Sequence, residues 1–290
     1  MSSGAATAPP ASAEPRHGVR IATIWAVATV IAVPLMIWVA GPHIPPFNGS
    51  EQSHEQHEIN VLLLSLSTPI AVLIWTYLVY SAVCFRQRGG AMLDGPPITG
   101  NAPLAVIWLT VTSVIVLGLA VVGTAELLGS SHGAGGGQGP SPLSQPPAGD
   151  HPLQVQVIGQ QWLWTFRYPG YGGVETPDLV IPEGRWVAFH VTSLDVAHSF
   201  WAYELGVKAD ALPGTDNVAY VKATKLESFQ VRCAELCGIW HGHMNTTGQV
   251  MTAAAFGAWI AQQESHYSGV TKYLPPYSDS YYPQPLRRAS

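Results

Sequence analysis

The chain has 290 residues, of which 47% are hydrophobic and only 11% are charged. That charged share is about half of the usual share in a soluble globular domain, so we expect part of the chain to lie in a membrane. The formal net charge is −5, and no run of Lys or Arg interleaves with aromatic residues. Nucleic acid is therefore not expected as a partner.

Three long apolar segments lie in the first half of the chain, at residues 21–40, 61–85 and 103–128. Each has about the 20 residues that a helix needs to span a bilayer, so each is a candidate transmembrane helix. Arginines flank one side of the first two segments, whereas residues 41–59 contain no Lys or Arg. Because cytoplasmic segments carry the excess of positive charge, residues 1–20 are expected to form a cytoplasmic tail, and residues beyond 128 to lie outside.

The first apolar segment, residues 21–40, has a second interpretation. An Arg-bearing start followed by an apolar run is also typical of a secretory signal, which would leave only a two-helix hairpin. The run is longer than the apolar core of most signals, contains Pro34 and lacks a clean Ala-x-Ala cleavage site, which favours a retained helix. In either case the domain that follows lies outside. We expect residues 41–59 to form a solvated polar loop between helices, with metal capture or pH sensing by His54 and His57 as the alternative.

The second half of the chain has a different composition. Residues 129–150 are rich in Gly, Pro and Ser, which is typical of a flexible linker. Short apolar stretches separated by turn residues then predict a small antiparallel sandwich or barrel over residues 151–262, with a short helix at 256–263. Residues 263–290 are expected to form an extended tail. The expected strands are 153–158, 162–168, 185–192, 217–223, 228–232 and 249–255.

Residues 233–244 read Cys-Ala-Glu-Leu-Cys-Gly-Ile-Trp-His-Gly-His-Met, and His198 lies upstream in Asp-Val-Ala-His-Ser-Phe. One tight loop can present four side chains to one point: Cys233, Cys237, His241 and Met244. Two thiolates, two imidazoles and a thioether favour copper, and a terminal Met is foreign to structural zinc sites. A mononuclear copper site needs one Cys, so the second indicates two ions bridged by sulfur. A disulfide between the two cysteines is the alternative.

These motifs resemble subunit II of haem–copper cytochrome c oxidases. The aromatic segment Gln161-Trp162-Leu163-Trp164 and the sequence at residues 207–214 add to the resemblance, which covers residues 60–262. It implies a membrane-anchored all-β protein, in which transmembrane helices precede an extracytoplasmic cupredoxin domain, a Greek-key β-barrel. It also implies a dinuclear copper (CuA) centre that accepts electrons from cytochrome c. The electrons would pass to haem in subunit I, where oxygen is reduced to water and protons are pumped.

The resemblance implies a role for each site residue. Cys233 and Cys237 would bridge the two copper ions. The remaining copper ligands would be His198, His241, Met244 and the backbone carbonyl of Glu235. The Glu235 carboxylate would bind Mg²⁺ shared with subunit I, in agreement with the preference of that ion for carboxylate oxygen. Trp162 would be the exposed aromatic residue through which the electron enters. Trp162 and Trp164 alternate as strand residues do, so one of the two is expected in the core and the other at the surface.

Some residues differ from the family's pattern. Gln160, Leu163 and Thr215 stand where the family usually has His, Tyr and Arg, and these changes leave the copper ligands intact. Ala105 stands where many members have a Glu near the mouth of a proton path, so no proton role is assigned to it. The sequence contains no Cys-x-x-Cys-His motif for a covalently attached haem.

Two other functions share part of the pattern. A membrane-tethered copper electron carrier or copper-delivery module would use the same ligands outside an oxidase complex, and association with a haem-bearing subunit I would distinguish the two. Nitrous-oxide reductases share the copper centre, but they are larger soluble enzymes with an additional His-rich propeller domain, for which this sequence has no counterpart.

Overall fold

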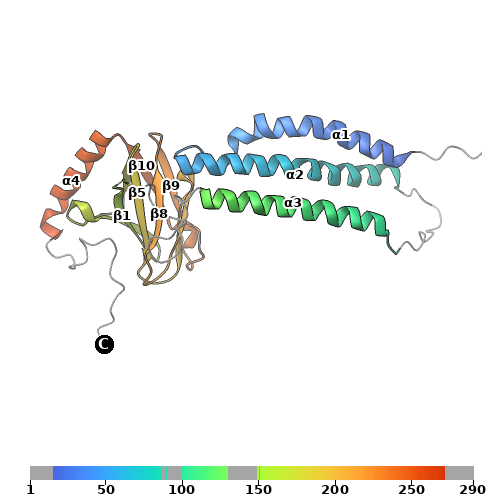
Figure 1. Ribbon diagram of the computed structural model, residues 1–290. Helices are drawn as coiled ribbons and strands as arrows, with labels where there is room; N and C mark the ends of the chain where they lie inside the picture. Colours follow the sequence, from blue (N-terminus) through green and yellow to red (C-terminus); the bar gives the residue numbers. More distant parts are fainter. Residues whose placement is uncertain (1–15, 87–88, 90–98, 130–148, 150, 272–290) are drawn as a thin grey trace, which may run out of the picture. The chain divides into compact units, whose positions relative to one another are not determined.

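The structure is a computed structural model that describes residues 16–86, 89, 99–129, 149 and 151–271. The chain forms two compact units, one of residues Met1–His43 and Asn60–Pro97, the other of Ile44–Ile59 and Ile98–Ser290. The second unit holds the start of the second helix and all the strands (Figure 1). The expected linker at 129–150 and tail at 1–20 lie largely outside the described residues.

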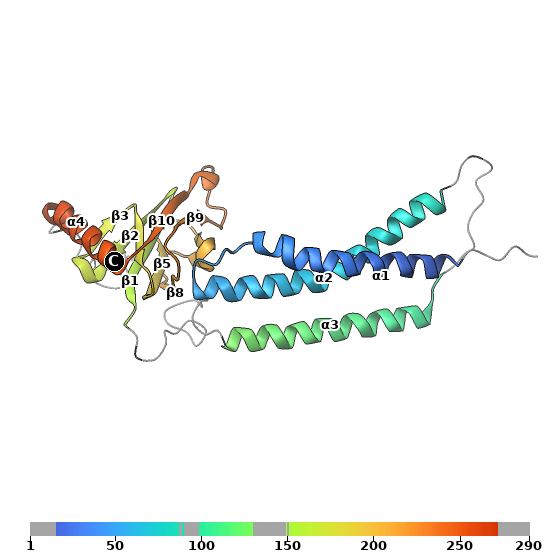
Figure 2. The same ribbon diagram turned by 90° about the horizontal axis from the view of Figure 1, so that it is seen from above.

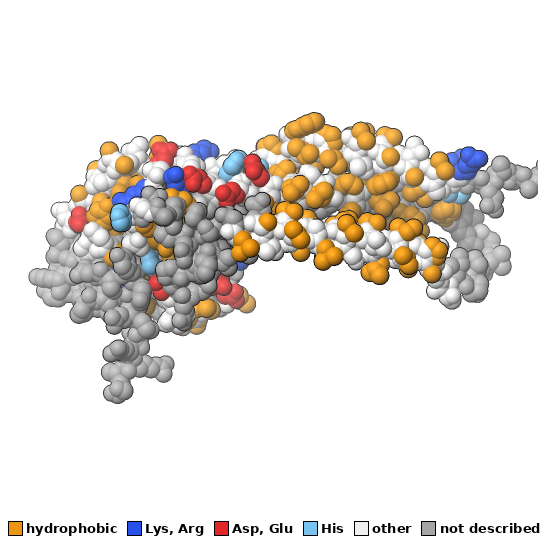
Figure 3. Space-filling model, viewed as in Figure 1, with side chains coloured by type: hydrophobic (Ala, Val, Ile, Leu, Met, Phe, Trp, Pro, Cys, Tyr) orange, Lys and Arg blue, Asp and Glu red, His pale blue; other side chains and the backbone are white. Residues whose placement is uncertain are grey.

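Three helices of the described chain are long and apolar enough to cross a membrane. Hydrophobic side chains are exposed along these helices in the view of Figure 3. Most of the charged side chains visible in that view lie on the β-domain or at the ends of the helices. Because lipid tails solvate such a surface and water does not, the chain is membrane-anchored. The helices are α1 (His17–Leu35), which continues through a π-helix (Met36–Ala40) and a 3-10 turn (Gly41–His43), α2 (Glu51–Cys84) and α3 (Ala102–Gly129).

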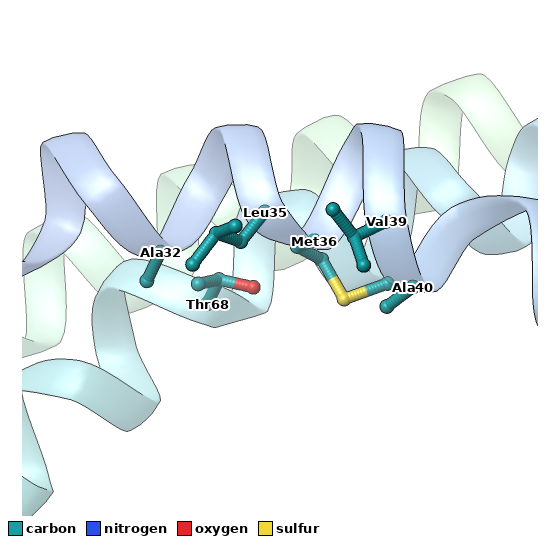
Figure 4. Close-up of a pocket in the computed structure, with 6 residues that line it drawn as sticks. All are labelled: Ala32, Leu35, Met36, Val39, Ala40 and Thr68. Atoms are coloured by element: carbon teal, nitrogen blue, oxygen red, sulfur yellow. The ribbon is translucent and has the colours of Figure 1, made fainter.

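The first unit contains α1 and most of α2. Pro34 and Pro69 lie inside these helices and lack the N–H of a regular helix bond. The later part of α2 changes direction in Figure 2, as a proline inside a helix can cause. The Trp25 Nε1 atom donates to the Pro69 carbonyl at 2.8 Å. Nearby, Leu35 and Thr68 help to line a shallow apolar groove between the two helices (Figure 4).

Two five-stranded sheets form the β-domain of the second unit, in the orders β3-β2-β1-β5-β8 and β4-β10-β9-β6-β7. The pairs β1–β5 and β4–β10 are parallel, and the other neighbours are antiparallel. One face of each sheet supplies a common core, in which Phe166, Phe189, Phe200 and Phe229 are fully buried. The strands are β1 (Leu153–Gln160), β2 (Leu163–Tyr168), β3 (Val174–Thr176), β4 (Leu179–Pro182), β5 (Trp186–Ser193), β6 (His198–Ala202), β7 (Val207–Ala211), β8 (Asn217–Lys222), β9 (Ser228–Cys233) and β10 (Asn245–Met251).

The expectation of a solvated loop at residues 41–59 is wrong in part, although Glu51, Glu55 and Glu58 are exposed. The helix α2 begins at Glu51, well before the apolar stretch, and Ser50, Gln52 and Ser53 are buried. The Ser53 N–H donates to Ser50 Oγ at 3.0 Å, and the Ser50 N–H donates to Ser53 Oγ at 2.9 Å. This reciprocal cap satisfies two backbone donors at the start of the helix, so polar residues extend it beyond the membrane segment.

The end of the domain also differs from the expectation. Helix α4 (Ala253–Thr271) is longer than the predicted helix and includes the first residues of the predicted extended tail. The predicted strand at 249–255 is wrong in its second half, because β10 ends at Met251 and the alanines that follow are strong helix formers. Phe256 and Ile260 anchor α4 in the core. Residues 272–290 lie outside the described chain.

Candidate metal centre

The loop between β9 and β10 carries most of the predicted ligands. β9 ends at Cys233, and Met244 immediately precedes β10, which pairs with β9 in antiparallel fashion. The Cys233 N–H donates to the Met244 carbonyl at 3.0 Å, which closes the base of the loop. Further along, the His241 N–H donates to the Gly238 carbonyl at 3.1 Å and starts a short 3-10 turn, His241–His243. Residues far apart along the loop are therefore held together at its base.

The predicted ligand atoms lie close together. Cys233 Sγ and Cys237 Sγ are 3.8 Å apart, and both are free thiols, so the disulfide alternative does not hold in this structure. Four other donor atoms each lie against one of the two sulfurs: His198 Nδ1 at 3.8 Å, His241 Nδ1 at 3.5 Å, Met244 Sδ at 3.8 Å and the Glu235 carbonyl oxygen at 3.2 Å. Sulfur and imidazole donors in one cluster fit copper better than Mg²⁺ or Ca²⁺.

His198 comes from a different part of the sheet and is fully buried. It begins β6, which pairs with β9 so that Phe200 lies opposite Cys233. Its Nε2 atom lies 2.8 Å from Asp195 Oδ1, so we infer that Nε2 carries the proton and that the Nδ1 lone pair faces Cys233. The imidazole ring packs closely over Gly159, where an added Cβ would lie 3.1 Å from the ring.

The Asp195 carboxylate is itself held by backbone groups. It accepts hydrogen bonds from the N–H groups of Gln161 at 2.7 Å and Val196 at 2.6 Å. Desolvation raises the pKa of Asp195, but the hydrogen bonds from Gln161, His198 and Val196 outweigh it, so the pKa is lowered from its ordinary value. The carboxylate therefore stays ionised and can orient the imidazole.

Trp162 lies against the loop between β9 and β10. It is not the strand residue that the sequence predicted, because β2 begins at Leu163 and Trp162 belongs to the preceding turn. Its Nε1 atom donates to the Cys237 carbonyl at 3.2 Å, and Gln161 Nε2 donates to the same oxygen at 2.8 Å. The Trp162 side chain is half-buried, whereas Trp164 is buried in the core.

Gly238 permits this close approach. Its φ angle is +121°, a conformation that residues with a Cβ rarely adopt. A Cβ at this position would lie 3.1 Å from Gln161 Nε2 and 3.2 Å from the Trp162 ring. A side chain on residue 238 would therefore push the indole away from the Cys237 carbonyl.

The thiol of Cys237 is protonated at neutral pH. Burial first, and then the hydrogen bond and charge of neighbouring Cys233, raise its pKa to about 11. Because the thiolate is the metal-binding form, a metal ion that binds Cys237 must displace this proton.

The side chain and the backbone of Glu235 lie in different surroundings. The side chain is exposed to solvent, whereas the backbone carbonyl faces the Cys233 sulfur.

Three residues that support the site have no role predicted from the sequence. Asp195 and Gln161 both lie in motifs that carry the family resemblance, and an acidic residue three positions before a candidate ligand could have indicated an orienting partner. Gly238 follows the second cysteine directly. Nothing in the sequence alone shows that its conformation makes room for Trp162.

The apolar helices, the two-sheet β-domain and this cluster of soft donors define a membrane-anchored copper protein of the electron-transfer class. A family model described as cytochrome C oxidase subunit II, periplasmic domain, matches residues 174–251. Cytochrome c oxidase subunit 2 of Thermostichus vulcanus is 30% identical over 286 residues, which cover 84% of this chain and 86% of the relative. The chain belongs to the family of cytochrome c oxidase subunit 2.

A second curated relative has the same description, and one solved structure is also similar. Cytochrome c oxidase subunit 2 of Synechocystis sp. is 29% identical and is matched over 80% of both chains. A crystal structure of the periplasmic domain of subunit II of cytochrome oxidase from Bradyrhizobium japonicum is 30% identical, with a TM-score of 0.39. The match covers 40% of this chain and 95% of that domain. Family membership confirms the predicted class of fold, membrane helices followed by a cupredoxin domain.

Proposed function

We propose that this chain is the electron-accepting subunit of a haem–copper oxidase and that Cys233 and Cys237 bridge two copper ions. The other proposed ligands are His198, His241, Met244 and the Glu235 carbonyl oxygen. One observation carries the proposal: two free thiols lie 3.8 Å apart, and each has an imidazole nitrogen within 3.8 Å. A mononuclear site would not need the second sulfur.

When held by these residues, copper would supply one-electron redox chemistry between a donor protein and the haem of subunit I. The chain's own residues hold the ligands and exclude water. The hydrogen bond between Cys233 and Met244 fixes the base of the loop, and Asp195 fixes the ring of His198. His198 and Met244 are almost completely buried, which keeps solvent from the cluster.

Trp162 is the proposed point of electron entry, with a c-type cytochrome as the donor. Its half-buried ring combines access from solvent with a hydrogen bond to the carbonyl of Cys237, a proposed copper ligand. An electron that arrives at the indole is thus one hydrogen bond away from the backbone of that ligand. Gln161 holds the same carbonyl from a second direction.

The side chain and backbone of Glu235 have separate proposed roles. The carbonyl oxygen faces the proposed copper site, whereas the exposed carboxylate is available to bind Mg²⁺ at a contact with subunit I.

We also propose that the chain crosses the membrane more than once. The three apolar helices and the arginines beside the first two support this topology, with the β-domain on the extracytoplasmic side.

Metal analysis of the full-length chain in detergent tests this function. After loading with copper, the wild type is expected to hold two copper ions per chain, and Cys233→Ser is expected to lose the purple colour of the bridged pair. Cys84→Ser is the matched control, because Cys84 is an exposed thiol at the end of α2. A colourless product with one zinc ion would refute the copper pair. Purification without any haem-bearing partner would favour a separate copper carrier or delivery module.

A further inference from the structure

The segment at residues 49–56, here called the docking loop, is bound to the β-domain by backbone and side-chain hydrogen bonds. Ser50 Oγ donates to the Leu205 carbonyl at 2.6 Å, and Gln52 Oε1 accepts from the Lys222 N–H at 3.1 Å. Three more hydrogen bonds are Gly49 N–H to the Glu204 carbonyl at 3.2 Å, Thr224 N–H to the Gly49 carbonyl at 3.1 Å and Gln56 Nε2 to the Gly206 carbonyl at 2.6 Å, and Lys222 Nζ lies 2.9 Å from Glu51 Oε1.

The contact is tightly packed as well as polar. Ser50 and Ser53 are 1% and 0% exposed, and Gln52 is 7% exposed. Gly206 has a φ angle of +67°, and a Cβ there would lie 2.8 Å from the backbone of Ser53. A side chain at residue 206 would therefore force the docking loop away from the domain. Such close backbone contact is not expected of a simple solvated connection between helices.

The docking loop is hydrogen-bonded to the turn that follows β6, and this turn is hydrogen-bonded to β9; each of these two strands carries a proposed copper ligand. Leu205 and Glu204 belong to the 3-10 turn Tyr203–Leu205, which directly follows β6, the strand that starts at His198. The Glu204 carboxylate in turn accepts from the Gln230 N–H at 3.0 Å in β9, the strand that ends at Cys233. A path of hydrogen bonds and strand backbone thus connects the docking loop to His198 and Cys233.

The docking loop is also the beginning of α2. The hydroxyl of Ser50 accepts from the Ser53 N–H and donates to the Leu205 carbonyl, so one side chain both caps the helix and binds it to the β-domain. The helix then continues to Cys84, with Pro69 inside it, through an apolar stretch long enough to cross the membrane. A displacement of the helix start would be passed to β6 and β9.

We propose that Ser50 and Gln52 are positioning residues for the electron transfer that leaves the copper centre. They fix the strands of His198 and Cys233 to the first turn of α2, so that the distance over which the electron passes to haem stays constant. This inference rests on the proposed function, in which one electron leaves the copper pair and reduces the haem of subunit I. Neither residue contacts a proposed copper ligand, so their effect is on distance and not on ligation.

The test uses the intact oxidase complex with the double substitution Ser50→Ala and Gln52→Ala. Flash-induced electron transfer from copper to haem is expected to slow severalfold, because the rate of electron tunnelling falls steeply as the distance between donor and acceptor grows. Copper content and the copper absorption spectrum should stay as in the wild type. Amide hydrogen exchange at Lys222 and Thr224 should accelerate, which reports the loss of the contact independently of activity.

Two single variants complete the test. Gln52→Glu keeps an oxygen acceptor for the Lys222 N–H and should retain the wild-type rate, whereas Glu55→Ala changes an exposed residue on the same turn and should have no effect. Faster amide exchange with an unchanged rate in the double variant would overturn the proposal, and so would loss of copper, which would indicate support of the site itself. Absence of copper-to-haem transfer in the wild type would refute the proposed function as well.

Discussion

Replacement of Asp195 by alanine is expected to weaken copper binding without unfolding the domain. The carboxylate holds His198 through Nε2 at 2.8 Å and is the group that leaves Nδ1 facing Cys233. Without it, the imidazole can rotate or protonate on the wrong nitrogen, and the ligand must be reoriented when metal binds. The effect acts through His198, because Asp195 is not among the proposed ligands.

The expected magnitude follows from the hydrogen bonds that the carboxylate makes. Loss of a group that orients a ligand weakens metal binding by about 10- to 100-fold, or about 1.4–2.8 kcal/mol. That range agrees with the loss of one hydrogen bond to a charged group, about 1.5–3 kcal/mol. The N–H groups of Gln161 and Val196 also lose their acceptor, but water can replace it because Asp195 is partly exposed.

The assay is a competition titration of the full-length chain against a copper chelator, with the copper absorption band as the readout. Asp195→Asn should weaken binding less than alanine does, because its amide oxygen can still accept from His198. Glu183→Gln, at an exposed turn residue far along the chain from the ligands, is the matched control. If Asp195→Ala binds copper with the affinity and spectrum of the wild type, Asp195 does not orient His198 for copper binding.

Three further predictions concern stability and pH. Gly238→Ala should lower the free energy of unfolding by about 1–3 kcal/mol in denaturant titrations, because alanine is strained at this φ angle and its Cβ would press against the Trp162 ring. Tyr168 donates to and accepts from the backbone of Val180, and burial raises its pKa above the ordinary 10.0, so Tyr168→Phe should cost about 1–3 kcal/mol at neutral pH. A raised pKa gives stability that is complete below the unfolded value and is lost as pH rises towards the folded value. The difference in free energy of unfolding between wild type and Tyr168→Phe should therefore shrink by up to about 1.4 kcal/mol per pH unit above about pH 10. Finally, because the pKa of Cys237 is raised to about 11, copper affinity should increase about tenfold per pH unit for each thiol proton released, measured by chelator competition between about pH 6 and 8.

The ligand loop could be predicted because its chemistry is local. Cys233, Cys237, His241 and Met244 are close in sequence, and any tight turn between two strands brings them near one another. The position of His198 depends instead on the pairing of β6 with β9, a register that no local pattern determines. The family resemblance, and not spacing, placed it in the site.

The errors have a common physical cause, the contribution of distant contacts. Residues 41–59 are polar and were expected to be solvated, but their hydroxyl and amide groups satisfy backbone groups of the β-domain more than a hundred residues away. Trp162 alternates with Trp164 as strand residues do, yet it lies in a turn whose backbone is held by Asp195. Apolar periodicity carries no information about such partners.

The buried start of α2 has a practical consequence for protein engineering. A soluble fragment cut at residue 150, as the linker invites, would leave the Leu205 and Gly206 carbonyls and the Lys222 amide without their present partners. Fusing residues 44–59 to such a fragment would restore these bonds. Crystallisation or titration of the truncated domain would otherwise describe a surface that the start of α2 covers in the longer chain.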